Sequence, residues 1–347
     1  MPLRIIDNLA IQRELKQGAT TKLNTSLHTA AEAPRDPIPS NKPFSFDKWL
    51  PLILRSREIP ASALQVVVLR RPQIELLAKA AAASIHTREL NRAYAEDLEE
   101  QVHPAFQALT FPPEGLFMRL GACPPKDGAH TAPGVLALRS VEDIVLRMTT
   151  SLRARSALTN VLNSDAEETQ AYFLPFDDRL QPFREYRVFC CPESLRITAV
   201  SQYEWHKPWT FAHFDKGVMS LRAQLIVLAL KRLQEKILEF MLAHEDRELE
   251  GVIRRQGFTF DAVYDRGMAC CKLIELNTFG VRSACGSCLF HWLEDRALLY
   301  GASVDIECRV TVAHEDTTWD EETMSRNEAV LNWLESFDSR RRPRLPE

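Results

Sequence analysis

Three oxygen-bearing side chains fall on two neighbouring segments that both have the pattern of β-strands. Glu275 and Asn277 are two residues apart in segment 272–277, so they share one face of that strand while the apolar residues point the other way. Asp261 lies in the preceding segment, 258–263, and a short turn joins the two. Carboxylate and amide oxygens are ligands that Mg²⁺ prefers, so the hairpin predicts a magnesium site shared with phosphates. The alternative is a solvated polar face on an antiparallel sheet.

Three positively charged side chains are candidates for contact with phosphates. Arg119 lies near the end of a predicted strand, and Lys126 lies in the Pro- and Gly-rich loop that follows it. Arg187 lies in a later predicted strand, between apolar neighbours. Phosphate chemistry depends on positioning and charge neutralisation, which such side chains supply. Taken singly, each is more often a surface charge or an ion-pair partner, but the combination indicates a phosphate-binding site.

The familiar nucleotide-binding signatures are missing. The sequence contains no G-x-x-x-x-G-K-[ST] loop and no G-x-G-x-x-G after a predicted strand. It also lacks the H-R-D and D-F-G pair of protein kinases and the G-x-S-x-G of α/β-hydrolases. We therefore expect any ATP site to be built without a P-loop.

Periodicity places these candidates on a strand-rich chain that also has several helices. The predicted strands cover 64–69, 117–120, 186–191, 195–202, 258–263, 270–276 and 304–312. The predicted helices begin near Pro72, cover 86–102, follow an N-cap at Ser140, and cover 221–243 and 319–337. Residues 1–43 are expected to form a polar arm, because the part from Gln17 to Pro43 is rich in small polar residues and proline and shows no period, which is typical of a linker or of disorder.

Composition limits the classes of partner. The chain has 347 residues, enough for about two domains, with 45% apolar and 26% charged residues. A net charge of −4 is too small to predict nucleic acid or a membrane surface as a partner. No apolar stretch is long enough for a membrane span, and residues 1–11 lack the apolar core of a signal peptide. A cytoplasmic location is therefore expected.

The eight cysteines are expected to be free thiols. A chain of this size folds without disulfide staples, and no secretory signal is visible. Cys285 and Cys288 form a single C-x-x-C, and a structural zinc site would need a second pair of ligands at motif spacing.

Five segments in order resemble the cell division cycle protein 123 family. They are FSFDKW at 44–49, FMRLGACPPKD at 117–127, EYRVF at 185–189, VSQ at 200–202, and FD at 260–261 followed by LIELNTFG at 273–280. The second is similar to the family's F-P-K-L-N-W-S-[SA]-P-K-D, and the last to its F-D-V-Y … L-I-D-F-N-P-F-G. The order and spacing of the segments hold over roughly residues 44–310.

The resemblance implies an α+β fold of the ATP-grasp type, with two lobes of antiparallel sheets and packed helices around an ATP cleft. The metal ligands would be Asp261, Glu275 and Asn277. The residues that bind the cofactor would be Arg119, Lys126, Arg187 and Asp178, the last in a hinge at 172–178. The expected regions are a polar arm (1–43), a helical and strand region (44–115), a first lobe (116–178), a second lobe with the metal site (179–312), and a C-terminal helix with a basic tail (313–347).

The sequence also departs from the family pattern. Arg119 replaces the family's first lysine, Gly121 begins a pair that replaces N-W, and Tyr203 replaces the arginine of S-Q-R-D. The acidic E-V-T-D-S that follows the hairpin is replaced by VRSACGS at 281–287, which contains Arg282. The chain therefore resembles a diverged member.

Two functions of different classes are candidates, and the gain of Arg282 together with the loss of the acidic loop favours the first of them. The first is an ATP-dependent carboxylate–amine ligase working through an acyl phosphate, with Arg282 holding a small carboxylate substrate beside the metal, as a guanidinium does well. The second is a non-catalytic, ATP-binding assembly chaperone that contacts a subunit of translation initiation factor 2, as the resemblance implies. A third possibility is a degenerate scaffold that binds nothing.

Overall fold

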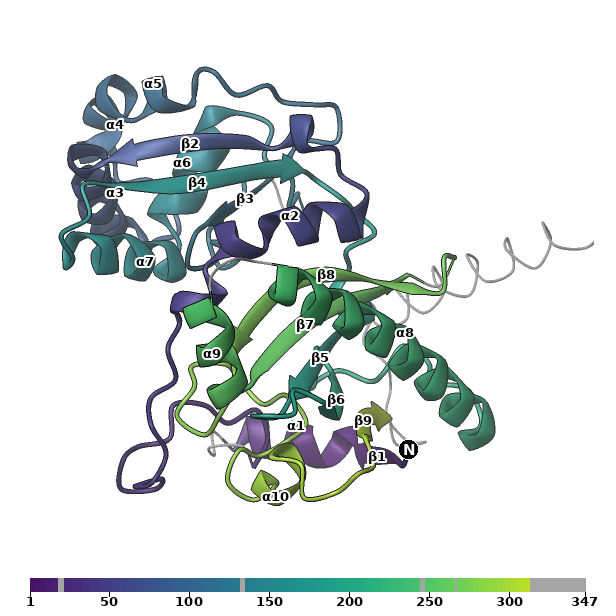
Figure 1. Cartoon of the computed structure of the whole chain (residues 1–347). Helices are drawn as coiled ribbons and strands as arrows, with labels where there is room; N and C mark the ends of the chain where they lie inside the picture. Colours follow the sequence, from purple (N-terminus) through teal and green to yellow (C-terminus); the bar gives the residue numbers. More distant parts are fainter. Residues whose placement is uncertain (18–21, 132–134, 244–246, 266, 313–347) are drawn as a thin grey trace, which may run out of the picture. The chain divides into compact units, whose positions relative to one another are not determined.

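The structure is a computed structural model that describes residues 1–17, 22–131, 135–243, 247–265 and 267–312. The chain divides into two compact units (Figure 1). Unit I combines Met1–Pro43 with the chain from Gln181 onward, and unit II is Phe44–Leu180. Within the described ranges, no helix has the length and apolarity that a membrane span requires.

Unit II is built on a three-stranded antiparallel sheet in the order β2 (Gln65–Arg70), β4 (Glu168–Pro175) and β3 (Leu116–Leu120). Its helices are α2 (Phe46–Arg57), α3 (Arg71–Ser84), α4 (Ala95–Gln101), α5 (His103–Phe106), α6 (Val141–Thr149) and α7 (Leu152–Leu162). Helices α3 to α7 share one apolar cluster with alternate residues of the three strands, so they cover one face of the sheet. Helix α2 contacts the other face, where Phe46 meets Tyr172 of β4 edge-on, with 5.3 Å between ring centroids.

Local signals in the sequence start two of these helices. The side chain of Ser140 accepts a hydrogen bond from the Asp143 amide at 3.2 Å, which caps α6 as predicted. Pro72 lies in the first turn of α3, where its missing N–H leaves no gap in the helix.

Unit I is built on a six-stranded sheet in the order β1 (Leu3–Asp7), β9 (Glu307–Val312), β6 (Ile197–Gln202), β5 (Glu185–Cys190), β7 (Phe258–Asp265) and β8 (Cys270–Thr278). The pairs β5–β6, β5–β7 and β7–β8 are antiparallel, so both predicted hairpins are present. Strand β9 lies parallel to both β6 and β1, which makes the sheet mixed. The expected α+β class with two sheets is thereby confirmed.

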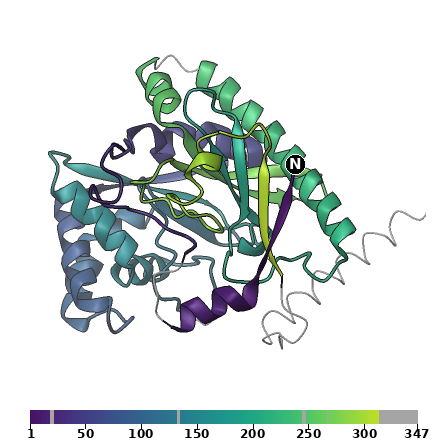
Figure 2. The ribbon, with the colours of Figure 1, turned by 90° about the horizontal axis from the view of Figure 1, so that it is seen from below.

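The two faces of this sheet are covered differently. Helix α8 (Lys216–Ala243) packs on β7 and β8, and Figure 2 shows it alongside the sheet; helix α9 (Arg247–Gln256) leads into β7. The opposite face is covered by the segment after β8, whose Phe279, Phe290 and Trp292 pack on Phe189 and Ala199 of the sheet. This segment contains α10 (Arg296–Leu299), and helix α1 (Asn8–Lys16) follows β1.

Two expectations differ from the structure. The N-terminal residues were expected to form a polar arm, yet Leu3–Asp7 is an edge strand of the unit I sheet. Its partner lies about 300 residues away along the chain and five residues are too few for a clear period, so local pattern could not reveal it. The helix expected over 86–102 begins only at Arg92, as a 3-10 turn (Arg92–Tyr94) that leads into α4, because Arg88 adopts a positive φ of 59° that a continuous helix does not allow. The helix expected over 319–337 lies outside the described residues.

Candidate functional site

A row of polar side chains crosses the sheet of unit I from β8 to β9. The strand register pairs each member with the next, so all of them lie on the same face. In order across the sheet, this polar row is Glu275, Asp261, Arg187, Ser201 and Arg309. Asn277 shares the face at the β8 end, because it lies two residues beyond Glu275.

Arg187 and Asp261 form a two-pronged ion pair at the centre of the row. Arg187 donates from Nε to one carboxylate oxygen of Asp261 at 2.8 Å and from Nη2 to the other at 2.6 Å. Its Nη1 donates to the carbonyl oxygen of Gly286 at 2.6 Å. Asp261 is fully buried and Arg187 nearly so. Burial alone would lower the pKa of Arg187, but the adjacent Asp261 carboxylate raises that pKa well above its ordinary value.

Asn277 connects the two carboxylates at the β8 end. Its Nδ2 lies 3.3 Å from Oδ2 of Asp261 and 3.4 Å from Oε1 of Glu275. Glu275 and Asn277 are partly exposed, in contrast to Asp261. The structure therefore brings together the three residues that the sequence predicted as metal ligands. Asp261 is the buried member of the three, and Glu275 and Asn277 are the partly exposed ones.

The chemistry of this set fits a magnesium ion that takes other ligands from phosphate and water. Mg²⁺ is usually held by one or two side-chain oxygens together with phosphate oxygens, and Glu275 and Asn277 provide such a pair. The Nδ2 of Asn277 faces the two carboxylates, so Oδ1 is the Asn277 atom that would bind the metal. Both oxygens of Asp261 already accept from Arg187, so Asp261 fits best as the group that orients Asn277. Among the described residues, no group of three or more His, Cys, Asp or Glu side chains could hold a metal by itself.

The segment after β8 is fastened to the polar row at several points. We call residues 280–296 the cover loop. Besides the bond from Arg187 to Gly286, the Leu289 amide donates to Oγ of Ser201 at 3.1 Å. Arg309 donates to the Leu289 carbonyl at 3.1 Å and to both carboxylate oxygens of Asp295 at 2.7 and 2.6 Å. The conformation of the cover loop is thus linked to the residues beside the candidate metal ligands.

An N-terminal segment is bonded along the cover loop, and sequence reasoning missed it. We call residues 24–36 the N-terminal strap. The Asn24 amide donates to the Cys288 carbonyl at 2.7 Å, and the Cys288 amide donates to Oδ1 of Asn24 at 3.0 Å. The Ser287 amide donates to the Thr25 carbonyl at 3.1 Å, and a Cβ added to Gly286 would lie 2.4 Å from Oδ1 of Asn24. The strap thus holds the turn whose Gly286 carbonyl contacts Arg187.

Arg282, the predicted carboxylate-binding residue, contacts this strap. Its Nη1 donates to the Asp36 carbonyl at 3.1 Å. The Asp36 carboxylate accepts from Arg296 at 2.7 Å, so two arginines of the cover loop contact one strap residue. In this structure Arg282 therefore has a role in fastening the strap.

The other predicted phosphate-side residues belong to unit II. Arg119 is buried, with its guanidinium 4.7 Å from the ring centre of Phe46. Lys126 is exposed in the loop after β3, next to Asp127, whose carboxylate accepts from Oγ of Ser151 at 2.5 Å. The hinge expected at 172–178 begins inside β4, and Asp178 follows that strand.

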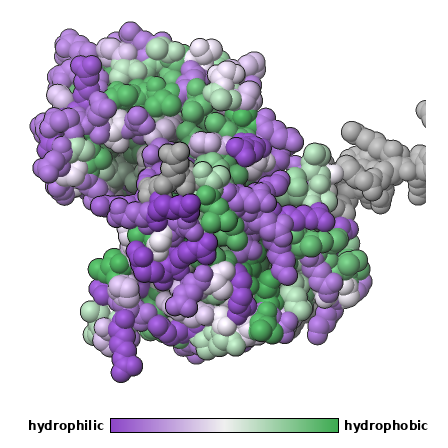
Figure 3. Space-filling view, viewed as in Figure 1, coloured by the Kyte–Doolittle hydropathy of each residue, from purple (hydrophilic) through white to green (hydrophobic). Residues whose placement is uncertain are grey.

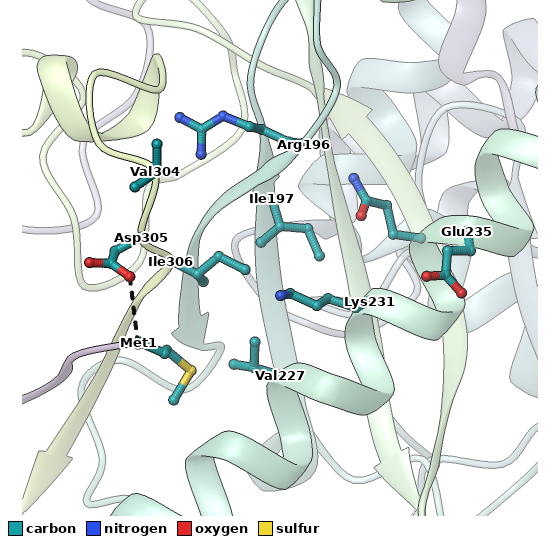
Figure 4. Close-up of a pocket in the computed structure, with 10 residues that line it drawn as sticks. Met1, Arg196, Ile197, Val227, Lys231, Glu235, Val304, Asp305 and Ile306 are labelled. Atoms are coloured by element: carbon teal, nitrogen blue, oxygen red, sulfur yellow. Dashed lines mark ion pairs between the residues drawn. The ribbon is translucent and has the colours of Figure 1, made fainter.

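A separate cavity of about 330 Å³ lies in unit I where α8 meets the ends of β6 and β9 (Figure 4). Its wall mixes the apolar Ile197 and Val227 with the charged Arg196, Lys231 and Glu235. The cavity shares no residue with the polar row. Its lining also includes the carboxylates of Glu235 and Asp305, and Asp305 forms an ion pair with the N-terminal amine of Met1 at 3.7 Å.

Comparison with known proteins identifies the fold. No family model matches the chain, and no curated protein matches it. Among solved structures, the chain is similar to Cdc123 from Schizosaccharomyces pombe, with a TM-score of 0.50 and 15% identity over 83% of this chain and 99% of that one. The C-terminally truncated form of the same protein gives a TM-score of 0.51 with 16% identity at the same coverage. The resemblance inferred from the sequence is thereby confirmed at the level of the fold.

Proposed function

We propose that this chain binds ATP through Mg²⁺ and serves as an assembly factor for a multisubunit complex, with a subunit of translation initiation factor 2 as its partner. The observation that carries the proposal is the convergence of Asp261, Glu275 and Asn277 on one sheet face, in a chain with the fold of Cdc123. A bound Mg²⁺ would neutralise phosphate oxygens at Glu275 and Asn277. Arg187 would hold Asp261, and through it Asn277, in a fixed orientation.

The contacts of Arg282 favour an assembly factor over a ligase. A carboxylate–amine ligase needs a cation that places its acid in line with the phosphate, because placement supplies much of the rate. Arg282 is the cover-loop residue that the sequence suggests for that task, and it donates to the backbone of the N-terminal strap. An assembly factor has no need of such a group.

Nucleotide binding is tested by calorimetry of the full chain with ATP, in Mg²⁺ and in EDTA. We expect binding only with the divalent cation, and an affinity at least about tenfold weaker in Glu275→Gln, since one tenfold step is about 1.4 kcal/mol. Glu239→Gln is the matched control, because Glu239 is an exposed glutamate on α8, outside the polar row. If ATP bound with equal affinity in EDTA and in Mg²⁺, the assignment of Glu275 and Asn277 to a magnesium site would be wrong.

The partner is tested by capture of purified translation initiation factor 2 subunits on the immobilised full chain, with Mg²⁺ and ATP present. We expect one subunit to be retained, and we expect no phosphate release in a panel of amino acids and other carboxylates. Carboxylate-dependent phosphate release without retention of any subunit would replace this proposal with the ligase.

A further inference from the structure

Helix α8 carries a row of exposed leucines on its outer side. Leu221, Leu225 and Leu228 are 56%, 41% and 47% exposed, while Ile226 and Leu230 on the other side are buried. The spacing i, i+4, i+7 places the three leucines in one stripe along the helix. The space-filling view shows apolar side chains among charged ones over this helix (Figure 3). An exposed apolar stripe of this kind marks a contact surface rather than a solvent-facing one.

The leucine stripe is set in a basic helix. Helix α8 contains five basic residues and two acidic ones. Two of the basic residues, Lys231 and Arg232, are exposed in the turn that follows Leu228. An occupant of this surface should therefore combine an apolar stripe with acidic flanks.

The described chain ends close to this helix. The Thr311 carbonyl at the end of β9 accepts from the Trp209 amide at 2.9 Å. Trp209 lies edge-on to Phe211 at 5.0 Å, and the guanidinium of Arg222 in α8 is 5.8 Å from the centre of the Phe211 ring. The chain therefore leaves β9 beside the N-terminal half of α8, where the leucines are.

The sequence beyond β9 has the complementary pattern. Residues 313–347 lie outside the described residues, and segment 319–337 has Val330, Leu334 and Phe337 at i, i+4, i+7, the same spacing as the leucine stripe. This segment contains five acidic residues and one basic residue. Its apolar stripe and its charge both match α8.

We propose that segment 319–337 docks as an amphipathic helix on the Leu221–Leu225–Leu228 face of α8, with its acidic residues beside Arg222, Lys231 and Arg232. The contact covers the leucines with a part of the same chain. This proposal is independent of nucleotide binding, because it involves no residue of the polar row.

The test is hydrogen exchange of the full chain, followed in peptides from α8 and from residues 325–338. We expect the amides of 325–338 to exchange at least about tenfold more slowly than in a synthetic peptide of that sequence, because docking protects a helix. Leu225→Asp and Leu334→Asp should each raise exchange to the rate of the peptide. Leu242→Asp is the matched control, since Leu242 is a 50% exposed leucine on α8, about 20 Å along the helix from Leu228.

Two controls in the hydrogen-exchange experiment show whether a Leu→Asp variant has misfolded. Leu334 lies outside the described fold, and exchange in β5 and β7 reports on unit I in every variant. Exchange of 325–338 at the rate of the peptide in the wild-type chain would overturn the proposal, as would protection that survives Leu225→Asp. Protection that disappears on dilution, with a dimer mass by light scattering, would assign the surface to a second copy and also overturn it.

Discussion

Two buried arginines of the polar row are held by carboxylates in different ways. Among the residues that the structure describes, Arg187 has one carboxylate partner, Asp261, which is fully buried. Arg309 has two, Asp295 and Glu307, and both of these carboxylates are 19% exposed. Arg309 also lies over the ring of Phe290, 4.1 Å from its centre.

Arginine–carboxylate ion pairs therefore have two different roles in this sheet. The Arg309 cluster joins the cover loop to β9, and it has a second carboxylate if one is lost. The Arg187 pair lies within the sheet and adjoins Asn277, and its two bonds of 2.6 and 2.8 Å both go to Asp261. Fastening tolerates redundancy, whereas a site needs one defined orientation, which a single two-pronged pair provides.

The largest expected effect is on stability, and it separates the two clusters. Asp261→Ala leaves Arg187 buried without its carboxylate, which should cost about 3–5 kcal/mol of unfolding free energy. Asp295→Ala leaves Arg309 with Glu307, so the loss should be about 1–3 kcal/mol. Urea unfolding of both full-length variants measures the difference. Equal losses would show that the two clusters do not differ in redundancy.

The second effect is on nucleotide binding and separates the exposed end of the site from its buried centre. Asn277→Ala removes a partly exposed side chain that points at two carboxylates, so it should change unfolding free energy by only about 0.5 kcal/mol. The affinity for ATP in Mg²⁺ should fall at least about tenfold, the equivalent of 1.4 kcal/mol. Calorimetry and urea unfolding of the same preparation give both values. A large loss of stability with unchanged affinity would make Asn277 a structural residue.

Sequence pattern predicted the parts of this site that depend on neighbouring residues. The two-residue period of a strand places Glu275 and Asn277 on one face, and the short hairpin turn brings Asp261 next to them. Both hairpins, helix α8 and the cap at Ser140 follow from equally local signals.

The contacts that sequence pattern could not predict join residues far apart in the chain. Nothing near Arg187 indicates that the Gly286 carbonyl will meet it, and nothing near Asn24 indicates its bonds to Cys288. The strap is bonded mainly through its backbone, which any polar sequence can supply, so composition alone resembled a linker. Strand β1 was missed for the same reason, because its partner is at the other end of the sequence.

The third effect concerns the strap and is smaller. Asn24→Ala removes one bond to the cover loop, which should cost about 1 kcal/mol. Burial raises the pKa of the Cys288 thiol to about 12, so this thiol should react slowly with a disulfide reagent at pH 8. The variant should label at Cys288 about fivefold faster, the factor that corresponds to a loss of about 1 kcal/mol in local stability.

Asn24→Asp is the matched control for this prediction, because it keeps the oxygen that accepts from the Cys288 amide. It should label at the wild-type rate. Equal labelling of the wild type and Asn24→Ala would mean that the strap does not protect the cover loop.

The smallest expected effect is that of Arg282→Ala, and it decides between fastening and catalysis. The change removes one hydrogen bond to the Asp36 carbonyl, worth about 0.5–1.5 kcal/mol of stability, while Arg296 still holds the Asp36 carboxylate. Arg296→Ala removes the other contact to Asp36 and should cause a similar loss of stability. In both variants the affinity for ATP should change less than about twofold, or about 0.4 kcal/mol. A ligase would behave differently, because loss of a guanidinium that holds the acid raises the KM for the carboxylate by about tenfold, or 1.4 kcal/mol, and does so in Arg282→Ala alone. Phosphate release over a panel of carboxylates distinguishes the two outcomes, and a carboxylate-dependent signal lost only in Arg282→Ala would return this residue to the active site of an enzyme.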